Sequence, residues 1–304
     1  MKAFKREADV IAVMGASGNT GRRISEQLLL EGEQIRVLGR AAGRLAGFES
    51  RGAEVLAGYA ADAAYLTRAF HGAEAVYTLL PPDPQSRDLR QKWDQEGAAI
   101  AKAIRDSGVR YVVFLSSVGA DLPEGTGPIA GLCAQEERLR RLPEVNVLIL
   151  RPASFFENFY AILGLVKHQG INGGAVAPDL RIPMIATRDI ADVAATALQA
   201  RDWSGVVVRE LLGARDLTFA EATRILGVQI GKPDLPYVQF PYADFAASLV
   251  QMGVSENVAG LYAEMARAFN ERRLDSREGR RPDNTTPTRF EDFAEDLARA
   301  YEAF

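Results

Sequence analysis

The feature that most constrains the fold of this chain is a glycine-rich turn directly after an apolar run near the N-terminus. The run Val10–Met14 has the composition of a buried strand, and Thr20–Leu30 has the pattern of a helix. Residues 15–21 between them read GASGNTG. Glycines let backbone N–H groups approach a phosphate closely, and the start of a helix favours an anion. This order of strand, turn and helix predicts the first unit of a dinucleotide-binding sheet.

The glycines of this turn are spaced Gly-x-x-Gly-x-x-Gly, not in the commoner Gly-x-Gly-x-x-Gly pattern. The alternative interpretation is a turn selected only for tight packing. Its place between the first strand and the first helix favours phosphate binding. The candidate phosphate-binding residues are Gly15, Ser17, Gly18, Asn19, Thr20 and Gly21.

The first half of the chain alternates apolar runs with helical stretches, which is typical of a parallel sheet covered on both faces. The predicted strands are Val10–Met14, Gln34–Gly39, Ala53–Ala57, Ala75–Leu80, Tyr111–Ser116, Val145–Leu150 and, later, Gly205–Leu211. The predicted helices are Thr20–Leu30, Gly43–Glu49, Asp62–Phe70, Leu89–Ser107, Leu132–Leu142 and Arg188–Ala200. We therefore predict an α/β fold built on a doubly wound parallel Rossmann sheet.

The end of the second predicted strand indicates the cofactor. An acidic residue there selects NAD through the ribose 2′-hydroxyl, whereas arginine accommodates a 2′-phosphate. This chain has Arg40 at that point and Arg44 one helical turn later. The alternative is two solvated surface arginines. We predict NADPH or NADP⁺ as the cofactor, in preference to NADH.

The alternating pattern breaks after Arg151. Residues 153–184 mix aromatic residues, prolines and paired glycines, and from Ala214 onward the chain is mainly helical. The segment Arg272–Thr288 is polar and predicts a surface loop, and Phe290–Phe304 predicts a final amphipathic helix. We predict an NADP-binding Rossmann domain at 1–152, to which 188–212 returns, and a smaller, mainly helical substrate-binding lobe at 153–304.

Motifs along nearly the whole chain carry a family resemblance. They are GASGNTG at 15–21, VLGR at 37–40, GAEAV at 72–76, FLSSVGA at 114–120, LRP at 150–152, FENF at 156–159, RDIADVA at 188–194 and TPT at 286–288. Together they resemble the NmrA-like group of atypical short-chain dehydrogenases, which includes quinone and triphenylmethane-dye reductases. The glycine-rich turn is shared very widely, while the Arg-Pro and Phe-Glu-Asn-Phe stretch is more particular to this group.

The resemblance implies roles for residues at the ends of the later strands. The cofactor's ribose and nicotinamide would contact Leu79, Leu80 and Pro81. The catalytic candidates are Ser116 and Ser117, and the substrate-binding candidates are Pro152, Phe155, Phe156 and Asn158. The alternatives are core packing for the phenylalanines and a tie to a loop backbone for Asn158.

The chain departs from the group and its superfamily in two places. The group often has Gly-Asp after the third strand, but this chain has Gly58-Tyr59, so the usual adenine contact is in doubt. None of the nine tyrosines is followed by lysine four positions on. A Tyr-x-x-x-Lys pair works because the lysine lowers the tyrosine's pKa for proton exchange with an alcohol or ketone. Its absence argues against oxidation of ordinary alcohols and leaves hydride transfer to a flat, electron-poor acceptor such as a quinone or dye.

A second class of function stays open. A dinucleotide sensor would bind NADP(H) without turnover and pass its occupancy to a protein partner, and the resemblance includes regulators of that kind. We place the reductase first, because an aromatic pocket beside nicotinamide is costly to keep without a ligand. A DNA-binding repressor would need a basic stripe or recognition helix, and the sequence has neither.

Composition narrows the partners and the compartment. The formal charge of −4 gives no pull toward nucleic acid, and no apolar run approaches the length of a membrane span. The single Cys133 fits a reducing cytoplasm and reads as a packing residue, and His71 and His168 do not make a metal site. We therefore expect a cytoplasmic protein with a small-molecule acceptor and no metal, nucleic acid or membrane partner. Fold analogy raises a homodimer paired through Leu89–Ser107, which the sequence does not decide.

Overall fold

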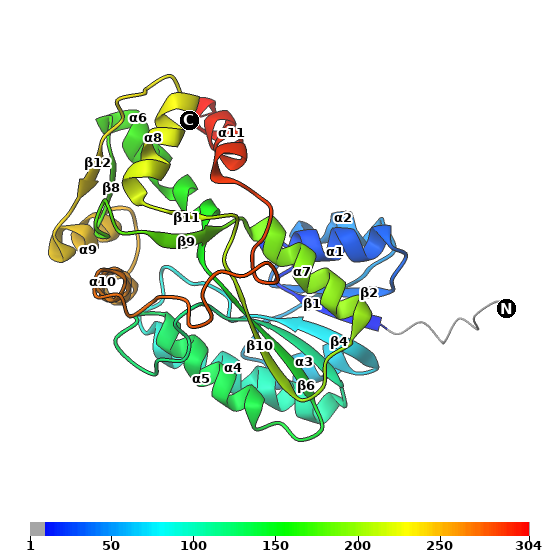
Figure 1. Ribbon diagram of the computed structural model, residues 1–304. Helices are drawn as coiled ribbons and strands as arrows, with labels where there is room; N and C mark the ends of the chain where they lie inside the picture. Colours follow the sequence, from blue (N-terminus) through cyan, green and yellow to red (C-terminus); the bar gives the residue numbers. More distant parts are fainter. Residues whose placement is uncertain (1–9, 304) are drawn as a thin grey trace.

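The computed structural model describes residues 10–303 and is built on a seven-stranded sheet (Figure 1). The strands are β1 (Val10–Met14), β2 (Ile35–Gly39), β3 (Glu54–Ala57), β4 (Ala73–Thr78), β5 (Tyr111–Leu115), β6 (Asn146–Pro152) and β10 (Val206–Leu211). They lie in the order β3-β2-β1-β4-β5-β6-β10, and every neighbouring pair is parallel. The reversal of strand order beside β1 is that of the Rossmann fold, and the predicted α/β class is confirmed.

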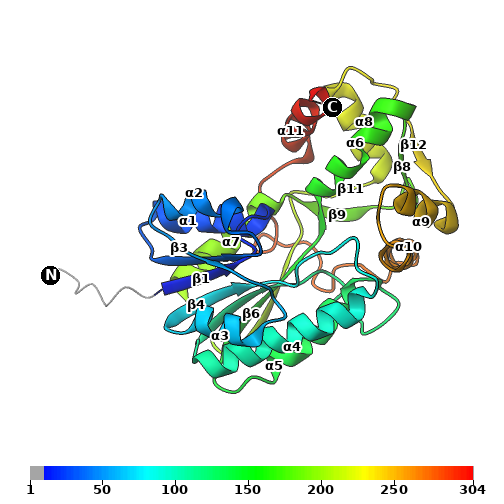
Figure 2. The same cartoon turned by 180° about the vertical axis from the view of Figure 1, so that it is seen from behind.

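Helices cover both faces of this sheet, as the two opposite views show (Figure 1 and Figure 2). One face carries α1 (Asn19–Leu30), the short α2 (Ala46–Glu49) and α7 (Thr187–Ala200). The other face carries α3 (Ala63–Phe70), α4 (Leu89–Ser107) and α5 (Ile129–Arg140). Asp62 and Asp88 cap α3 and α4 by accepting hydrogen bonds from backbone N–H groups of their first turns. The predicted helix Gly43–Glu49 is instead split into a 3₁₀ turn, η1 (Ala42–Arg44), and α2.

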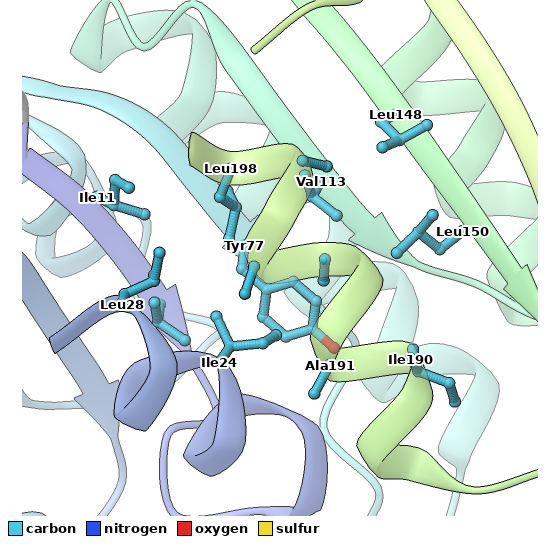
Figure 3. Close-up of a cluster of buried hydrophobic side chains, with 14 of the residues drawn as sticks. Ile11, Ile24, Leu28, Tyr77, Val113, Leu148, Leu150, Ile190, Ala191 and Leu198 are labelled. Carbon is cyan, nitrogen blue, oxygen red and sulfur yellow. The ribbon is translucent and has the colours of Figure 1, made fainter. Parts of the chain in front are cut away.

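Tyr77 of β4 lies at the centre of the core between the sheet, α1 and α7. Its ring is surrounded by Ile24 and Leu28 of α1 and Ala191 of α7 (Figure 3). Its hydroxyl donates a hydrogen bond of 2.9 Å to Oγ1 of Thr20. Burial raises the pKa of Tyr77 far above its ordinary value, so the phenol stays protonated and keeps this bond. The bond fastens the start of α1 to the middle of the sheet.

The C-terminal portion is helical, as predicted, and it also contains two small sheets. Its helices are α6 (Leu163–Gln169), α8 (Phe219–Gln229), α9 (Tyr242–Gln251), α10 (Glu256–Asn270) and α11 (Phe290–Glu302), with the 3₁₀ helix η2 (Phe156–Ile162) before them. The sheets are β11-β9-β7 and β12-β8, from β7 (Ser154–Phe155), β8 (Asn172–Gly174), β9 (Ile182–Ile185), β11 (Asp216–Leu217) and β12 (Tyr237–Gln239). Phe156, Phe159, Phe290 and Phe293 are buried in its core. We call this portion, without α7 and β10, the C-terminal lobe.

The segment Arg272–Thr288 is more firmly attached than a surface loop. Asn284 is buried, and the Glu210 carboxylate on β10 accepts hydrogen bonds from the Ser276 hydroxyl and the Arg277 backbone N–H. Asp189 of α7 accepts from both the backbone N–H and the hydroxyl of Thr288. The prediction of a simple surface loop is therefore wrong for its buried part.

Three further predictions concern the final helix, membrane spans and the division into domains. The final helix ends at Glu302, and Phe304 lies outside the described residues. No helix within residues 10–303 is long and apolar enough to cross a membrane. The division into two domains at residue 152 remains a prediction, although α7 and β10 both lie in the layers of the large sheet.

Candidate active site

The glycine-rich turn brings the end of β1 and the start of α1 into direct contact. Gly15 has a φ of +66°, which favours glycine, and its carbonyl accepts a hydrogen bond of 2.8 Å from the Gly18 N–H. A Cβ on Gly21 would lie 2.4 Å from the Gly15 carbonyl oxygen. Gly18 caps α1 without any side-chain hydrogen bond, and the first turn of α1 contains no acidic residue. The turn therefore fits a pyrophosphate, because Gly15, Gly18 and Gly21 have no side chain to keep a phosphate from the backbone at the start of α1.

The six predicted phosphate-binding residues divide by exposure. Gly18 and Asn19 are exposed and Gly15 and Ser17 are half-buried, so all four lie at or near the surface. Thr20 and Gly21 are buried, and the Thr20 hydroxyl already accepts from Tyr77. The Thr20 side chain therefore serves packing, Gly21 has no side chain, and only the backbone of these two residues is left for a phosphate.

The other predicted cofactor residues follow β2 and β4. Arg40 and Arg44 are both exposed, and Arg40 lies near enough to the buried Glu96 to counteract the rise that burial causes in the pKa of that carboxyl. The half-buried Leu79 faces the glycine-rich turn, because a Cβ on Gly15 would be 2.9 Å from its Cδ2 atom. Leu80 is buried, and the Pro81 carbonyl accepts a hydrogen bond of 2.9 Å from the Trp93 indole.

A pocket of about 210 Å³ lies at the carboxyl ends of β5 and β6. Five of the predicted residues line it, namely Ser116, Ser117, Pro152, Phe155 and Asn158. The rest of its lining is Val118, Pro128, Ile129, Leu132, Ala153, Ser154, Pro183, Met265, Phe269 and Leu274. The pocket is therefore mainly apolar, and ligands of doubly wound sheets bind at this same edge.

The hydroxyls of both predicted catalytic serines are already engaged within the protein. Ser116 is buried and donates to Oε1 of Glu136 over 2.5 Å. The same carboxylate accepts two hydrogen bonds from Arg151, from Nε at 2.9 Å and from Nη2 at 2.6 Å. Ser117 donates to the Val118 carbonyl over 2.9 Å. Toward the pocket these oxygens can accept a hydrogen bond, but neither hydroxyl offers its proton.

Two predicted substrate residues differ sharply in their surroundings. Phe156 does not line the pocket; it is buried in the lobe, with its ring centroid 5.0 Å from that of Phe290. The alternative role, core packing, is what the structure shows for Phe156. Asn158 lines the pocket and is exposed, and its side-chain amide makes no hydrogen bond to any described residue, so it does not tie a loop backbone.

The sequence did not single out the roof of the pocket. Met265 and Phe269 stand one turn apart on α10, and Leu274 follows that helix. The N-terminus of α10 is attached to the loop after β4, since the Ser255 N–H and hydroxyl donate to the carbonyls of Pro84 and Ser86. In the sequence, the i, i+4 spacing of Met265 and Phe269 was the only signal for these pocket residues, and an ordinary buried helix has the same spacing.

The thiol and the carboxylates elsewhere add no catalytic centre. Cys133 lies outside the pocket lining, and burial raises its pKa, so the reactive thiolate is disfavoured. Within residues 10–303 no three His, Cys, Asp or Glu side chains are grouped to hold a metal ion.

The glycine-rich turn, the strand order and the pocket at the carboxyl edge together define a nucleotide-binding protein of the Rossmann type. The model of the NmrA-like family matches residues 7–295, and the chain belongs to this family, as its motifs predict.

Three known proteins illustrate the similarity. A (4-alkanoyl-5-oxo-2,5-dihydrofuran-3-yl)methyl phosphate reductase of Streptomyces griseus is 32% identical over 72% of this chain and 74% of its own length. Quinone oxidoreductase 2 of Escherichia coli is 27% identical over 84% of this chain and 86% of its own. The crystal structure of the Escherichia coli NADPH-dependent quinone oxidoreductase with NADPH superimposes with a TM-score of 0.79, at 23% identity, over 94% of this chain and 99% of that one. The Citrobacter triphenylmethane reductase with NADP(H) gives 0.77, at 22% identity, over 95% and 99%.

Proposed function

We propose that this chain is an NADPH-dependent reductase that passes a hydride to a flat, electron-poor acceptor such as a quinone, a cationic dye or a conjugated carbonyl compound. The observation that carries the proposal is the pocket beside β5 and β6. It is mainly apolar, and the hydroxyls of Ser116 and Ser117 in it are engaged by other groups. An acceptor that needs little proton assistance suits such a pocket, whereas a simple ketone does not.

The residues around the two sites have distinct roles in this proposal. NADPH, when bound, supplies the hydride. The backbone of the turn at residues 15–21 holds the pyrophosphate, and Arg40 binds the 2′-phosphate. Phe155 and the α10 side chains Met265 and Phe269 flank the acceptor and exclude water. The chain thus aligns donor and acceptor, which is the main contribution a protein makes to a hydride transfer of this kind.

The relatives support the same class of reaction. Their names describe reductases of a quinone, of triphenylmethane dyes and of an alkanoyl-dihydrofuranone phosphate, and two of the solved structures contain NADPH or NADP(H). All of these acceptors are conjugated, and an apolar pocket accommodates conjugated rings.

The test follows NADPH absorbance while the purified protein meets a panel of quinones, cationic triphenylmethane dyes, an unsaturated lactone and simple ketones. We expect steady oxidation with one or more conjugated acceptors and none with the ketones. Turnover of ketones alone would overturn the proposal.

The cofactor assignment has its own test. Arg40→Ala should weaken NADPH binding by roughly 10- to 100-fold, the worth of charge-assisted hydrogen bonds to a phosphate, and should weaken NADH binding much less. Both dissociation constants are measured by quenching of protein fluorescence. Equal losses for the two cofactors would contradict contact with the 2′-phosphate.

The second candidate is an NADP(H) sensor that acts through a protein partner. It is favoured by α10, which connects the loop after the cofactor strand β4 to the pocket roof and so offers a route for transmitting occupancy. Tight NADPH binding without turnover on any acceptor of the panel would favour this function over the reductase.

A further inference from the structure

A second pocket, of about 300 Å³, lies between α7 and the strands β6 and β10, and it shares no residue with the acceptor pocket beside β5 and β6. Its apolar part is formed by Leu148 of β6, by Val193, Ala197 and Ala200 of α7, and by Trp203, which follows this helix. Leu148 lies on the face of the sheet that α7 covers (Figure 3). Because two of the three α7 side chains are alanines, they leave space above the strands that larger side chains would fill. The pocket can therefore hold an apolar group.

Two opposite charges at this pocket have no partner within the described chain. Asp202 and Arg209 both line the pocket and are exposed, and neither makes a hydrogen bond or an ion pair with any residue in 10–303. Trp203 is only 9% exposed, and its indole N–H group is buried without an acceptor. Buried donors almost always have an acceptor, so a ligand in the pocket that brings one would complete this group.

The third charged side chain of the lining, Asp192, is already engaged. Its carboxylate accepts a hydrogen bond of 2.8 Å from Nη2 of Arg23 and one of 2.6 Å from the Gln27 amide, both on α1. The charges left for a ligand are therefore one carboxylate, on Asp202, and one guanidinium, on Arg209.

This set of groups matches the parts of a free α-amino acid. A guanidinium donates two parallel hydrogen bonds to a carboxylate, and a carboxylate accepts from an ammonium group. The apolar part of the pocket would cover a hydrocarbon side chain. A phosphate would meet the unpaired Asp202, and a ligand without charges would desolvate both Asp202 and Arg209 with no compensation.

We propose that the pocket between α7 and β10 binds a free α-amino acid with an apolar side chain. Its carboxylate accepts from Arg209 and from the Trp203 indole, its ammonium group donates to Asp202, and its side chain packs on Leu148 and Val193. Binding is non-covalent. The inference goes beyond the proposed reductase function and does not depend on it.

The test uses saturation-transfer NMR with L-leucine as the probe. We expect L-leucine to bind the wild-type protein with a dissociation constant of about 1 mM or lower. Three analogues each lack one of the recognised parts: L-leucinamide lacks the carboxylate, N-acetyl-L-leucine lacks the ammonium group, and glycine lacks the side chain. Each should bind about tenfold more weakly or worse, since a charge-assisted hydrogen bond or a buried leucine side chain contributes at least that much.

Variants locate the binding in this pocket. Arg209→Gln and Asp202→Asn should each weaken L-leucine binding by about tenfold or more. The matched control is Arg224→Gln, which changes an exposed arginine of α8 that lines neither pocket and should leave the dissociation constant within about twofold. Ala200→Leu fills the pocket from the exposed side of α7 and should block binding without unfolding the helix, because leucine favours helix. Thermal melting checks that each variant is folded.

Three results would overturn the proposal. The first is no saturation transfer to L-leucine with the wild-type protein. The second is binding of L-leucinamide or N-acetyl-L-leucine as tight as that of L-leucine, which would show that the two charges are not recognised. The third is an equal loss in Arg209→Gln and Arg224→Gln, or undiminished binding to folded Ala200→Leu, which would place the amino acid elsewhere.

Discussion

Gly21 lies where α1 begins against the end of β1, and the backbone of the preceding turn leaves no room for a side chain. A Cβ there would be 2.4 Å from the Gly15 carbonyl oxygen and 2.9 Å from that of Met14, and neither can rotate away. Gly21→Ala should lower the free energy of unfolding by about 1–3 kcal/mol, as overpacking usually does, and should weaken NADPH binding by displacing the turn. Urea unfolding and NADPH titration measure the two effects.

Gly47→Ala is the matched control, because a Cβ on Gly47, in α2, would meet nothing within 4 Å. It should leave stability unchanged or slightly raised, since alanine favours helix more than glycine does. If both variants unfold at the same urea concentration, the tight contact at Gly21 is not what holds the turn.

Glu157 links η2 to α7, and its titration should be visible in stability. Burial raises the pKa of Glu157 above its ordinary value, although hydrogen bonds from Thr187 pull the other way. The folded protein then binds this proton more tightly than the unfolded chain does. The contribution of Glu157 protonation to the free energy of unfolding is complete below the pKa of the unfolded chain, near 4.5, and is lost as pH rises through the pKa of the folded protein.

The variant Glu157→Gln removes this titration while keeping an oxygen that accepts from Thr187. The free energy of unfolding of the wild type should fall relative to the variant as pH rises from 4 to 8, about the range in which a raised carboxyl titrates. Unfolding by urea at several pH values measures the difference. A difference that stays constant, or that grows in favour of the wild type, would contradict the raised pKa.

At the scale of elements, one buried ion pair joins α5 to β6 beneath the pocket. Glu136 and Arg151 are only 1% and 8% exposed and are linked by two hydrogen bonds. Glu136→Gln leaves the guanidinium with the more distant carboxylates of Asp121, 3.9 Å away, and Glu210. We expect a loss of about 3 kcal/mol in the free energy of unfolding, because an uncompensated buried charge costs that much.

The double variant Glu136→Leu, Arg151→Met should recover much of the stability lost in Glu136→Gln, because it leaves no unpaired charge. Lys102→Ala, which breaks the exposed pair with Asp106 on α4, should change stability by less than about 1 kcal/mol. A loss in Glu136→Gln no larger than that of Lys102→Ala would show that the buried pair does not hold α5 on the sheet.

At the scale of the whole molecule, α10 of the C-terminal lobe lies between α9 and the side of the sheet that carries α4 and α5 (Figure 1). Its N-terminal end holds the loop after β4 through Ser255, and the Asn257 side chain accepts from the Leu89 N–H at the start of α4 over 3.0 Å. Its C-terminal half carries Met265 and Phe269, which line the pocket at the ends of β5 and β6. One helix therefore connects the loop after β4 to the pocket lining.

The double variant Ser255→Ala, Asn257→Ala should lower the free energy of unfolding by about 1–3 kcal/mol, from the lost hydrogen bonds. It should raise KM for the acceptor more than it lowers kcat, because the roof binds the acceptor and does not react. Glu264→Gln is the control on the same helix, since its contact with Arg90 is long and exposed. Steady-state kinetics in which the double variant and the control behave alike would contradict the bridging role.

The sequence determined the sheet, because its signals are local. Continuous apolar runs, the glycine-rich turn and the helical periods between them each depend on neighbouring residues, and all seven strands of the large sheet were predicted within a few residues of their bounds. Pro152 and Phe155 were predicted from the family resemblance, and both line the pocket. Short local motifs also identified the family.

Only the tertiary structure decided which side chains face the pocket and which hydroxyls remain able to donate a hydrogen bond to a ligand there. Phe155 and Phe156 are adjacent in sequence, yet one lines the pocket and the other fills the lobe core, because the chain passes from strand to 3₁₀ helix between them. Ser116 loses its proton-donating capacity to Glu136, and the pocket roof comes from a helix more than a hundred residues away. Such partners are set by packing between distant elements. Neither segment contains a periodicity or motif from which its partner in the shared core could be identified.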